Sequence, residues 1–240
     1  MMTPQALSQV AVNSTVRAGL RRSRVYQILQ PGQRPMSGSG AIPVMHFSSV
    51  PSLQAAISGG QLPAGTRAVL YDPERWSFTP VSEQRNPVGA AQRAAAIAHA
   101  HGLLLIVAPG LDLVSGLSPS RAPYWQKFLS LRLAAGLARV ADGVELQAQS
   151  LERDTATYVR FVRAAARQAR AASPGITVLA GLSTNPPGAS VASSQLSAAA
   201  IGAGSAIDGF WLNIPGRGVK CPRCQAINPE IGVLALQSIL

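Results

Sequence analysis

Three carboxylates lie in or directly after predicted strands, where side chains are well placed for acid/base chemistry. Asp72 and Glu74 follow the apolar run 68–71, and Glu145 lies within 142–149. Side chains alternate between the two faces of a strand, so Asp72 and Glu74 share one face. Paired carboxylates can supply the acid and base of glycoside hydrolysis, or of an elimination, isomerisation or cyclisation. We therefore predict Asp72, Glu74 and Glu145 as catalytic residues.

Amide and aromatic side chains accompany these acids. Every second residue from Val144 to Ala148 is apolar, whereas Glu145, Gln147 and Gln149 form a polar row. A polar row is costly inside a packed core unless it faces water or a ligand, or joins a hydrogen-bonded core network without chemistry. Aromatic faces beside carboxylates and amides suit sugars and, equally, cations. The predicted substrate-binding residues are Tyr71, Trp76, Gln147, Gln149, Trp211 and Asn213.

An alternation of strands and helices must position these residues. The apolar patterns predict strands at 25–29, 44–47, 68–71, 103–107, 143–149, 176–182 and 209–214, and helices at 52–58, 87–101, 124–141, 151–172, 194–202 and 231–240. Such alternation implies parallel strands joined by crossover helices. We predict an α/β fold of the (β/α) TIM-barrel type, possibly with fewer than eight regular units. An open parallel sheet is the alternative. In a barrel, the carboxyl ends of the strands form the active-site mouth.

The charge distribution separates the start of the chain from the rest. The 240 residues carry a net charge of +11, and no acidic residue occurs before Asp72. We predict residues 1–40 as a basic arm, or a first strand plus loop, and 41–240 as the barrel domain. No nucleic-acid-binding module surrounds the short basic run 21–24, so nucleic acid is not a predicted partner.

Hydropathy argues against a membrane partner. No apolar run approaches the 18 or more residues of a membrane span. The sequence as it stands lacks a signal-peptide pattern, which predicts a cytoplasmic protein, or a secreted one if a signal was removed. The oligomeric state stays open.

Cysteine and histidine spacing predicts neither a metal nor a cofactor. Cys221 and Cys224 resemble half of a zinc knuckle, and the other half is missing. His99 and His101 do not share a helix face. Asp72, Glu74 and Glu145 could hold a divalent cation, but no histidine joins them in the sequence. The two cysteines form either a short-range disulfide, if the protein is exported, or a pair of reduced thiols.

The run 142–149 resembles a known signature. Its sequence, Asp-Gly-Val-Glu-Leu-Gln-Ala-Gln, is similar to the D-G-x-D-x-D-x-E signature of the chitinase family of (β/α) barrels. The resemblance implies that the last position of this signature is the catalytic acid. Here that position is Gln149, and the middle Asp position is Gln147. Glutamine cannot donate a catalytic proton, so the resemblance implies a member that does not cleave chitin by the family mechanism.

Three functions fit these observations. The first is a barrel enzyme that uses carboxylate acid/base chemistry on a polar small molecule or saccharide. The second is a catalytically inactive, chitinase-like glycan-binding protein. The third is a biosynthetic lyase or cyclase that uses the same pocket. Under each, the expected partner is a small-molecule or saccharide ligand.

Overall fold

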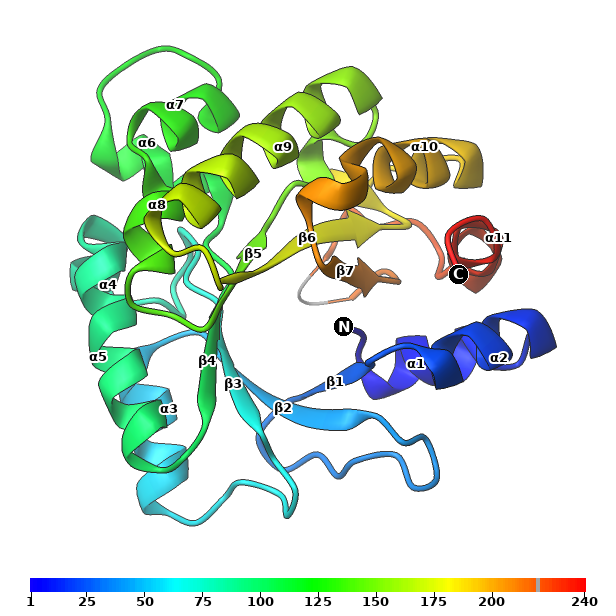
Figure 1. The fold of residues 1–240 in the computed structure, drawn as a ribbon, viewed down its shortest axis with the longest axis horizontal. Coiled ribbons are helices and arrows are strands. Elements are labelled where there is room, and N and C mark those ends of the chain that lie inside the picture. Colours follow the sequence, from blue (N-terminus) through cyan, green and yellow to red (C-terminus); the bar gives the residue numbers. More distant parts are fainter. Residues whose placement is uncertain (219–220) are drawn as a thin grey trace.

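The computed structural model describes residues 1–218 and 221–240, and in them seven parallel strands lie side by side in chain order. The sheet curls into a barrel with helices around it, a TIM-type fold with fewer than eight units (Figure 1). The strands are β1 (Tyr26–Leu29), β2 (Ile42–Phe47), β3 (Ala68–Tyr71), β4 (Leu104–Val107), β5 (Gly143–Leu146), β6 (Thr177–Ser183) and β7 (Gly209–Asn213). The barrel prediction is therefore confirmed.

Helices cover the outer face of this sheet (Figure 1). They are α1 (Pro4–Val10), α2 (Ser14–Arg22), α3 (Val50–Ser58), α4 (Val81–Arg85), α5 (Pro87–Ala100), α6 (Val114–Leu117), α7 (Tyr124–Ser130), α8 (Leu133–Ala138), α9 (Thr155–Ala172), α10 (Ser193–Ala203) and α11 (Pro229–Gln237). α5 shows why they pack closely, because its buried side, from Ala90 to Ala98, consists of alanines. No helix in the described ranges is long and apolar enough to cross a membrane.

Two apolar clusters divide the strand side chains. The larger one lies between sheet and helices and includes Tyr71, Leu146 and Ala148. The smaller one includes Ile28, Val44, Leu70, Ile106, Leu179 and Trp211, the strand residues of the opposite parity, which face the barrel interior. Continuing that parity toward the carboxyl ends places polar side chains above this apolar layer. The sheet therefore directs Glu145 of β5 inward, and Gln147 follows just beyond the end of the strand.

The first two residues close the sheet between β1 and β7. The N–H of Met2 donates to the Tyr26 carbonyl at 3.0 Å, and Ile28 donates to Met2 at 2.8 Å. On the other side, Leu212 donates to the Met1 carbonyl at 3.0 Å. Figure 1 shows the N-terminus in the gap between the two edge strands. The dipeptide thus lies where an eighth strand would.

Residues 1–40 differ from an extended arm. They contain β1, which the sequence predicts, and α1 and α2, which it does not. Asn13 caps α2 by accepting from the Val16 N–H, and Leu7 and Val10 on α1 are buried. Packing against the barrel therefore holds this segment in place.

Three predicted elements need correction. The helix expected at 124–141 is two helices, because Arg132 has a φ of 52° between α7 and α8. The helix expected from residue 151 begins at Thr155, where Asp154 accepts from the Thr157 N–H. The strand expected to reach Gln149 ends at Leu146, because the chain turns and the Ala148 N–H donates to the Leu146 carbonyl.

Cys221 and Cys224 form a disulfide, the first of the two alternatives left by the sequence. The pair closes a short loop after β7, where Gly218 and Cys221 exchange two backbone hydrogen bonds. The loop is relevant to a cavity described below.

Candidate functional site

A buried histidine and aspartate meet at the carboxyl ends of β2 and β3. These strands pair with Phe47 opposite Tyr71, and the Asp72 N–H donates to the Phe47 carbonyl, so the next inward side chains are His46 and Asp72. His46 Nε2 lies 2.8 Å from Asp72 Oδ2, and the residues are 6% and 4% exposed. A carboxylate in this position fixes both the tautomer and the orientation of the imidazole.

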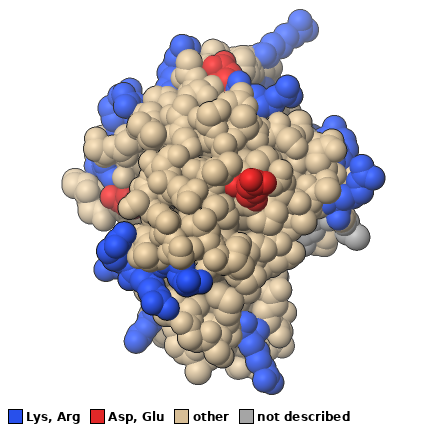
Figure 2. Space-filling view, turned by 90° about the vertical axis from the view of Figure 1, so that its right-hand side faces the viewer, with Lys and Arg blue, Asp and Glu red and all other residues tan. Residues whose placement is uncertain are grey.

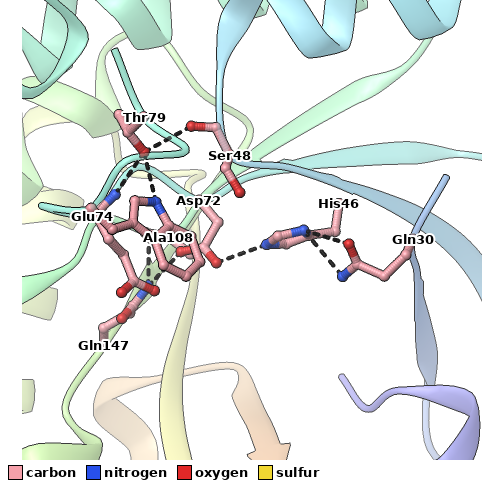
Figure 3. Close-up of polar contacts among 9 residues, drawn as sticks. Gln30, His46, Ser48, Asp72, Glu74, Thr79, Ala108 and Gln147 are labelled. Carbon is pink, nitrogen blue, oxygen red and sulfur yellow. Dashed lines mark hydrogen bonds and ion pairs between the residues drawn. The ribbon is translucent and has the colours of Figure 1, made fainter. Parts of the chain in front are cut away.

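Gln30, beyond the end of β1, contacts the other ring nitrogen of His46. Its Nε2 lies 3.2 Å and its Oε1 3.3 Å from His46 Nδ1, as Figure 3 shows. The amide can therefore donate to Nδ1 of the neutral ring or accept from Nδ1–H of the charged ring. His46 can gain or lose a proton without losing a hydrogen-bond partner.

Gln147 holds the opposite side of Asp72. Its Nε2 donates to Asp72 Oδ1 at 2.5 Å and to the Ala108 carbonyl at 2.9 Å, and it lies 3.4 Å from Glu74 Oε1 (Figure 3). Both Asp72 oxygens are thus engaged, one by His46 and one by Gln147. A continuous hydrogen-bonded chain runs from Gln30 to Gln147 across the mouth.

Glu145 lies two residues before Gln147 on the same inward face. It is 0% exposed, and neither carboxylate oxygen has a partner among the described residues. Loss of hydration, and then the charge of Asp72, raise the pKa of the Glu145 carboxyl well above its usual range. Burial and the nearby Asp72 charge therefore favour the protonated form of Glu145.

Glu74 and Trp76 belong to the loop that leaves β3. The buried Thr79 hydroxyl accepts from the Glu74 N–H at 3.2 Å and from Trp76 Nε1 at 2.9 Å. It donates to the Ser48 carbonyl at 2.9 Å, which ties the loop to the end of β2 (Figure 3). Glu74 and Trp76 are only half-buried, so a ligand at the mouth can contact them.

Tyr71 does not join the mouth. It faces the helices, is fully buried, and donates from its hydroxyl to Glu83 Oε2 at 2.7 Å. Burial, and then this bond, raise the pKa of Tyr71. The predicted contact with substrate has no geometric support, because Tyr71 has the opposite parity to Asp72.

The remaining predicted residues lie on the β5 to β7 side. Gln149 covers Gly181 of β6, since a Cβ on Gly181 would lie 2.3 Å from Gln149 Nε2. Trp211 is in the interior cluster, and its indole N–H has no partner among the described residues. Asn213 shares its parity and is half-buried at the end of β7. The structure thus places Asp72, Glu74 and Gln147 in contact, Gln149 in the turn after β5, and Trp211 and Asn213 on β7.

Asp142, the first residue of the chitinase-like run, lies at the other end of its strand. Its Oδ2 accepts from the Leu105 N–H and lies 2.8 Å from His99 Nε2. It therefore stabilises the start of β5 and takes no part in the mouth.

Sequence reasoning missed His46, Gln30 and Glu152. His46 lies two residues after Val44, so its inward parity was available, but its contact with Asp72 depends on the strand register. Glu152 is 0% exposed and accepts from the Ser183 N–H at 2.7 Å. Loss of hydration raises the pKa of Glu152 to about 9, against the opposing effect of that N–H. Within residues 1–218 and 221–240, no group of three or more His, Cys, Asp or Glu could hold a metal ion.

Comparison with known proteins gives a fold likeness only. No family model matches the chain, and no curated protein matches it. Triosephosphate isomerase from Bartonella henselae is 10% identical, with a TM-score of 0.46 over 89% of this chain and 91% of that one. A pyruvate carboxylase from Rhizobium etli is 12% identical, with a TM-score of 0.46 over 82% of this chain and 20% of that one.

Thiamine phosphate pyrophosphorylase from Pyrococcus furiosus is 13% identical, with a TM-score of 0.29 over 94% of this chain and the whole of that one. The chain spans a fifth of the pyruvate carboxylase and about a third of its separate carboxyl transferase domain. Every one of these TM-scores is below 0.5, so the neighbours' activities carry no argument for this chain.

Proposed function

We propose that the barrel mouth catalyses acid/base chemistry on a polar small molecule or saccharide. The observation that carries this proposal is the His46–Asp72 pair, held by Gln30 on one side and Gln147 on the other. The Gln30 amide can pair with the ring in either protonation state, which suits an imidazole that exchanges a proton during turnover.

The contacts suggest a role for each group. His46 transfers the proton from Nδ1 once a ligand displaces the half-buried Gln30 amide, and Asp72 orients the ring and stabilises its charged form. Glu74, half-buried and 3.4 Å from the Gln147 amide, is the carboxylate that a ligand can reach. Glu145 has no exposed surface, so it does not contact the ligand. Hydrolysis and elimination or cyclisation remain alternative reactions of this machinery.

A glycan-binding protein without turnover is the second candidate. The observation in its favour is Gln149, the amide at the position where the chitinase signature carries its acid. Gln149, Trp211 and Asn213 could hold a sugar without reacting with it.

Substrate screening on variants separates the two candidates. The wild-type chain is incubated with aryl glycosides, chitooligosaccharides and hydroxy acids, and products are followed by mass spectrometry. Asp72→Asn should reduce any turnover about 100-fold or more, because it removes the charge that stabilises protonated His46. Glu230→Gln, an exposed carboxylate on α11, is the matched control. Saccharide binding without product in the wild type would establish the binding protein, and full activity in Asp72→Asn would exclude the proposed chemistry.

A further inference from the structure

A cavity of about 560 Å³ lies where β7 ends, apart from the Asp72 cluster. Its walls come from the start of α1, the last residues of β7 and the loop that follows. The lining residues are Thr3, Gln5, Asn213, Ile214, Pro215, Gly216, Arg217, Ala226 and Ile227. Because the cavity is at the carboxyl ends of the strands, it is on the same side of the barrel as the mouth.

The cavity has the opposite electrostatic character to the mouth. Its lining contains no carboxylate, and it contains the guanidinium-bearing Arg217. None of the ion pairs among the described residues involves Arg217, whose one side-chain hydrogen bond runs from Nε to the Cys224 carbonyl at 3.4 Å. The Asn213 amide makes no side-chain hydrogen bond with a described residue. Donors from both side chains are therefore available to a ligand.

Backbone contacts fix the wall that carries Arg217. Its N–H donates to the Gln225 carbonyl at 3.2 Å, and the Cys221–Cys224 disulfide closes the loop between them. On the β7 side, the buried Asn185 donates from Nδ2 to the Pro215 carbonyl at 2.8 Å. The backbone that carries Arg217 is thus held in place before a ligand arrives, which lowers the cost of ordering this wall on binding.

We propose that this cavity binds an anionic oxygen group, a carboxylate or a phosphate, of a ligand whose uncharged polar part lies in the mouth. Arg217 supplies the charge-assisted hydrogen bonds, and Asn213, inward-facing at the end of β7, joins the cavity to the mouth. The carboxylates Asp72 and Glu74 repel an anion, so the ligand takes a single orientation, anion toward β7 and reacting part toward β3. The link to a reacting part rests on the proposed function, whereas anion binding does not.

Titration with simple anions tests the cavity directly. Sodium phosphate and sodium acetate are titrated into the whole chain at constant ionic strength, with sodium chloride as the balancing salt, and binding is followed by calorimetry and by amide chemical shifts. Arg217→Ala should weaken anion binding about tenfold or more, and Arg217→Lys should restore part of it. Arg223→Ala, another exposed arginine of the same loop that does not line the cavity, should leave binding unchanged.

Each outcome decides something. Saturation by phosphate alone identifies a phosphoryl ligand, by acetate alone a carboxylate ligand, and either supports the inference if Arg217→Ala removes it. No saturable binding of either anion, or equal loss in Arg217→Ala and Arg223→Ala, overturns it. Asp72→Asn should keep the anion affinity. If Asp72→Asn loses turnover and the wild type binds no anion, the proposed function stands and the anion site is rejected. If the wild type binds the anion and Asp72→Asn keeps full turnover, the anion site stands and the proposed function is rejected.

Discussion

Buried carboxyl groups in this barrel differ in the number of hydrogen-bond donors that contact their oxygens. Glu83 accepts from the Tyr71 hydroxyl and the Val50 N–H. Glu152 has one oxygen on the Ser183 N–H and the other without a partner among the described residues, and Glu145 has no such partner at all. The fewer donors a buried carboxylate has, the more strongly its ionised form is disfavoured. The protonated form is therefore favoured at Glu145 and Glu152, whereas the Glu83 side chain links β3 to the start of α3.

Replacing Glu152 should change how stability depends on pH. Its folded-state pKa of about 9 lies above the usual value, so the proton favours the folded state. That contribution is complete below the usual carboxyl pKa and is lost as pH rises toward 9, at up to about 1.4 kcal/mol per pH unit. Glu152→Gln, which keeps an acceptor for Ser183, should flatten this slope. Urea unfolding between pH 5 and 9 measures it, with Glu230→Gln as the control, and equal slopes would contradict the assigned protonation.

Removing the Tyr71 hydroxyl should affect stability and not the site. Tyr71→Phe leaves Glu83 buried with one donor fewer, which costs about 1–3 kcal/mol of unfolding free energy. Tyr124→Phe, on an exposed tyrosine of α7, should cost little. Chemical denaturation measures the difference, and ligand titration checks the mouth. A variant that folds as well as wild type but loses ligand affinity would return Tyr71 to the site.

At the scale of elements, two loops meet where β3 and β4 end. The Gly110 N–H donates to the Pro73 carbonyl at 2.9 Å. A Cβ at Gly110 would lie 2.7 Å from Asp112 Oδ1, 2.9 Å from Glu74 Cγ and 3.3 Å from Glu74 Cα. The close approach of these loops therefore positions Glu74 beside the Gln147 amide.

Gly110→Ala should displace Glu74 more than it unfolds the chain. Since part of the clash is with backbone, the loop must shift, at a cost of about 1–3 kcal/mol. Turnover, or ligand affinity where no turnover is found, should fall more than the melting temperature does. Gly116→Ala is the matched control, because nothing lies within 4 Å of its new Cβ. If both variants behave alike, contact between the loops does not set the position of Glu74.

Sequence periodicity predicted the strands and the parity of β5, because both depend on local alternation. It missed His46 as a site residue, because one histidine in an apolar run carries no signal until the register of β2 and β3 is known. It also missed the break at Arg132. The backbone of Arg132 is left-handed, but no adjacent glycine or proline indicates a break there. Elements follow from local patterns, whereas contacts between elements follow from packing.

At the scale of the whole molecule, charge and chemistry are separated. The chain has a net charge of +11, yet the mouth holds Asp72, Glu74 and Glu145. Figure 2, which looks onto the side of α2, α10 and α11, shows most Lys and Arg side chains around the edge of this face, with an acidic side chain near its centre. This separation of charge fits the ligand orientation that we propose, with the anionic part held away from Asp72 and Glu74.

Closure of the barrel is also a property of the whole molecule, since Met2 bonds to β1 and Met1 bonds to β7. Met2→Pro removes the N–H that donates to Tyr26, whereas Met2→Ala keeps the backbone bonds and loses only side-chain burial. Met2→Pro should therefore be less stable than Met2→Ala, by about 1–3 kcal/mol.

Native-state hydrogen exchange supplies the specific readout. The N–H groups of Ile28 and Leu212, which donate to Met2 and Met1, should lose protection together in Met2→Pro and stay protected in Met2→Ala. If protection at Leu212 is unchanged while Ile28 is exposed, the two edges open separately, and the dipeptide acts as an extension of β1 alone.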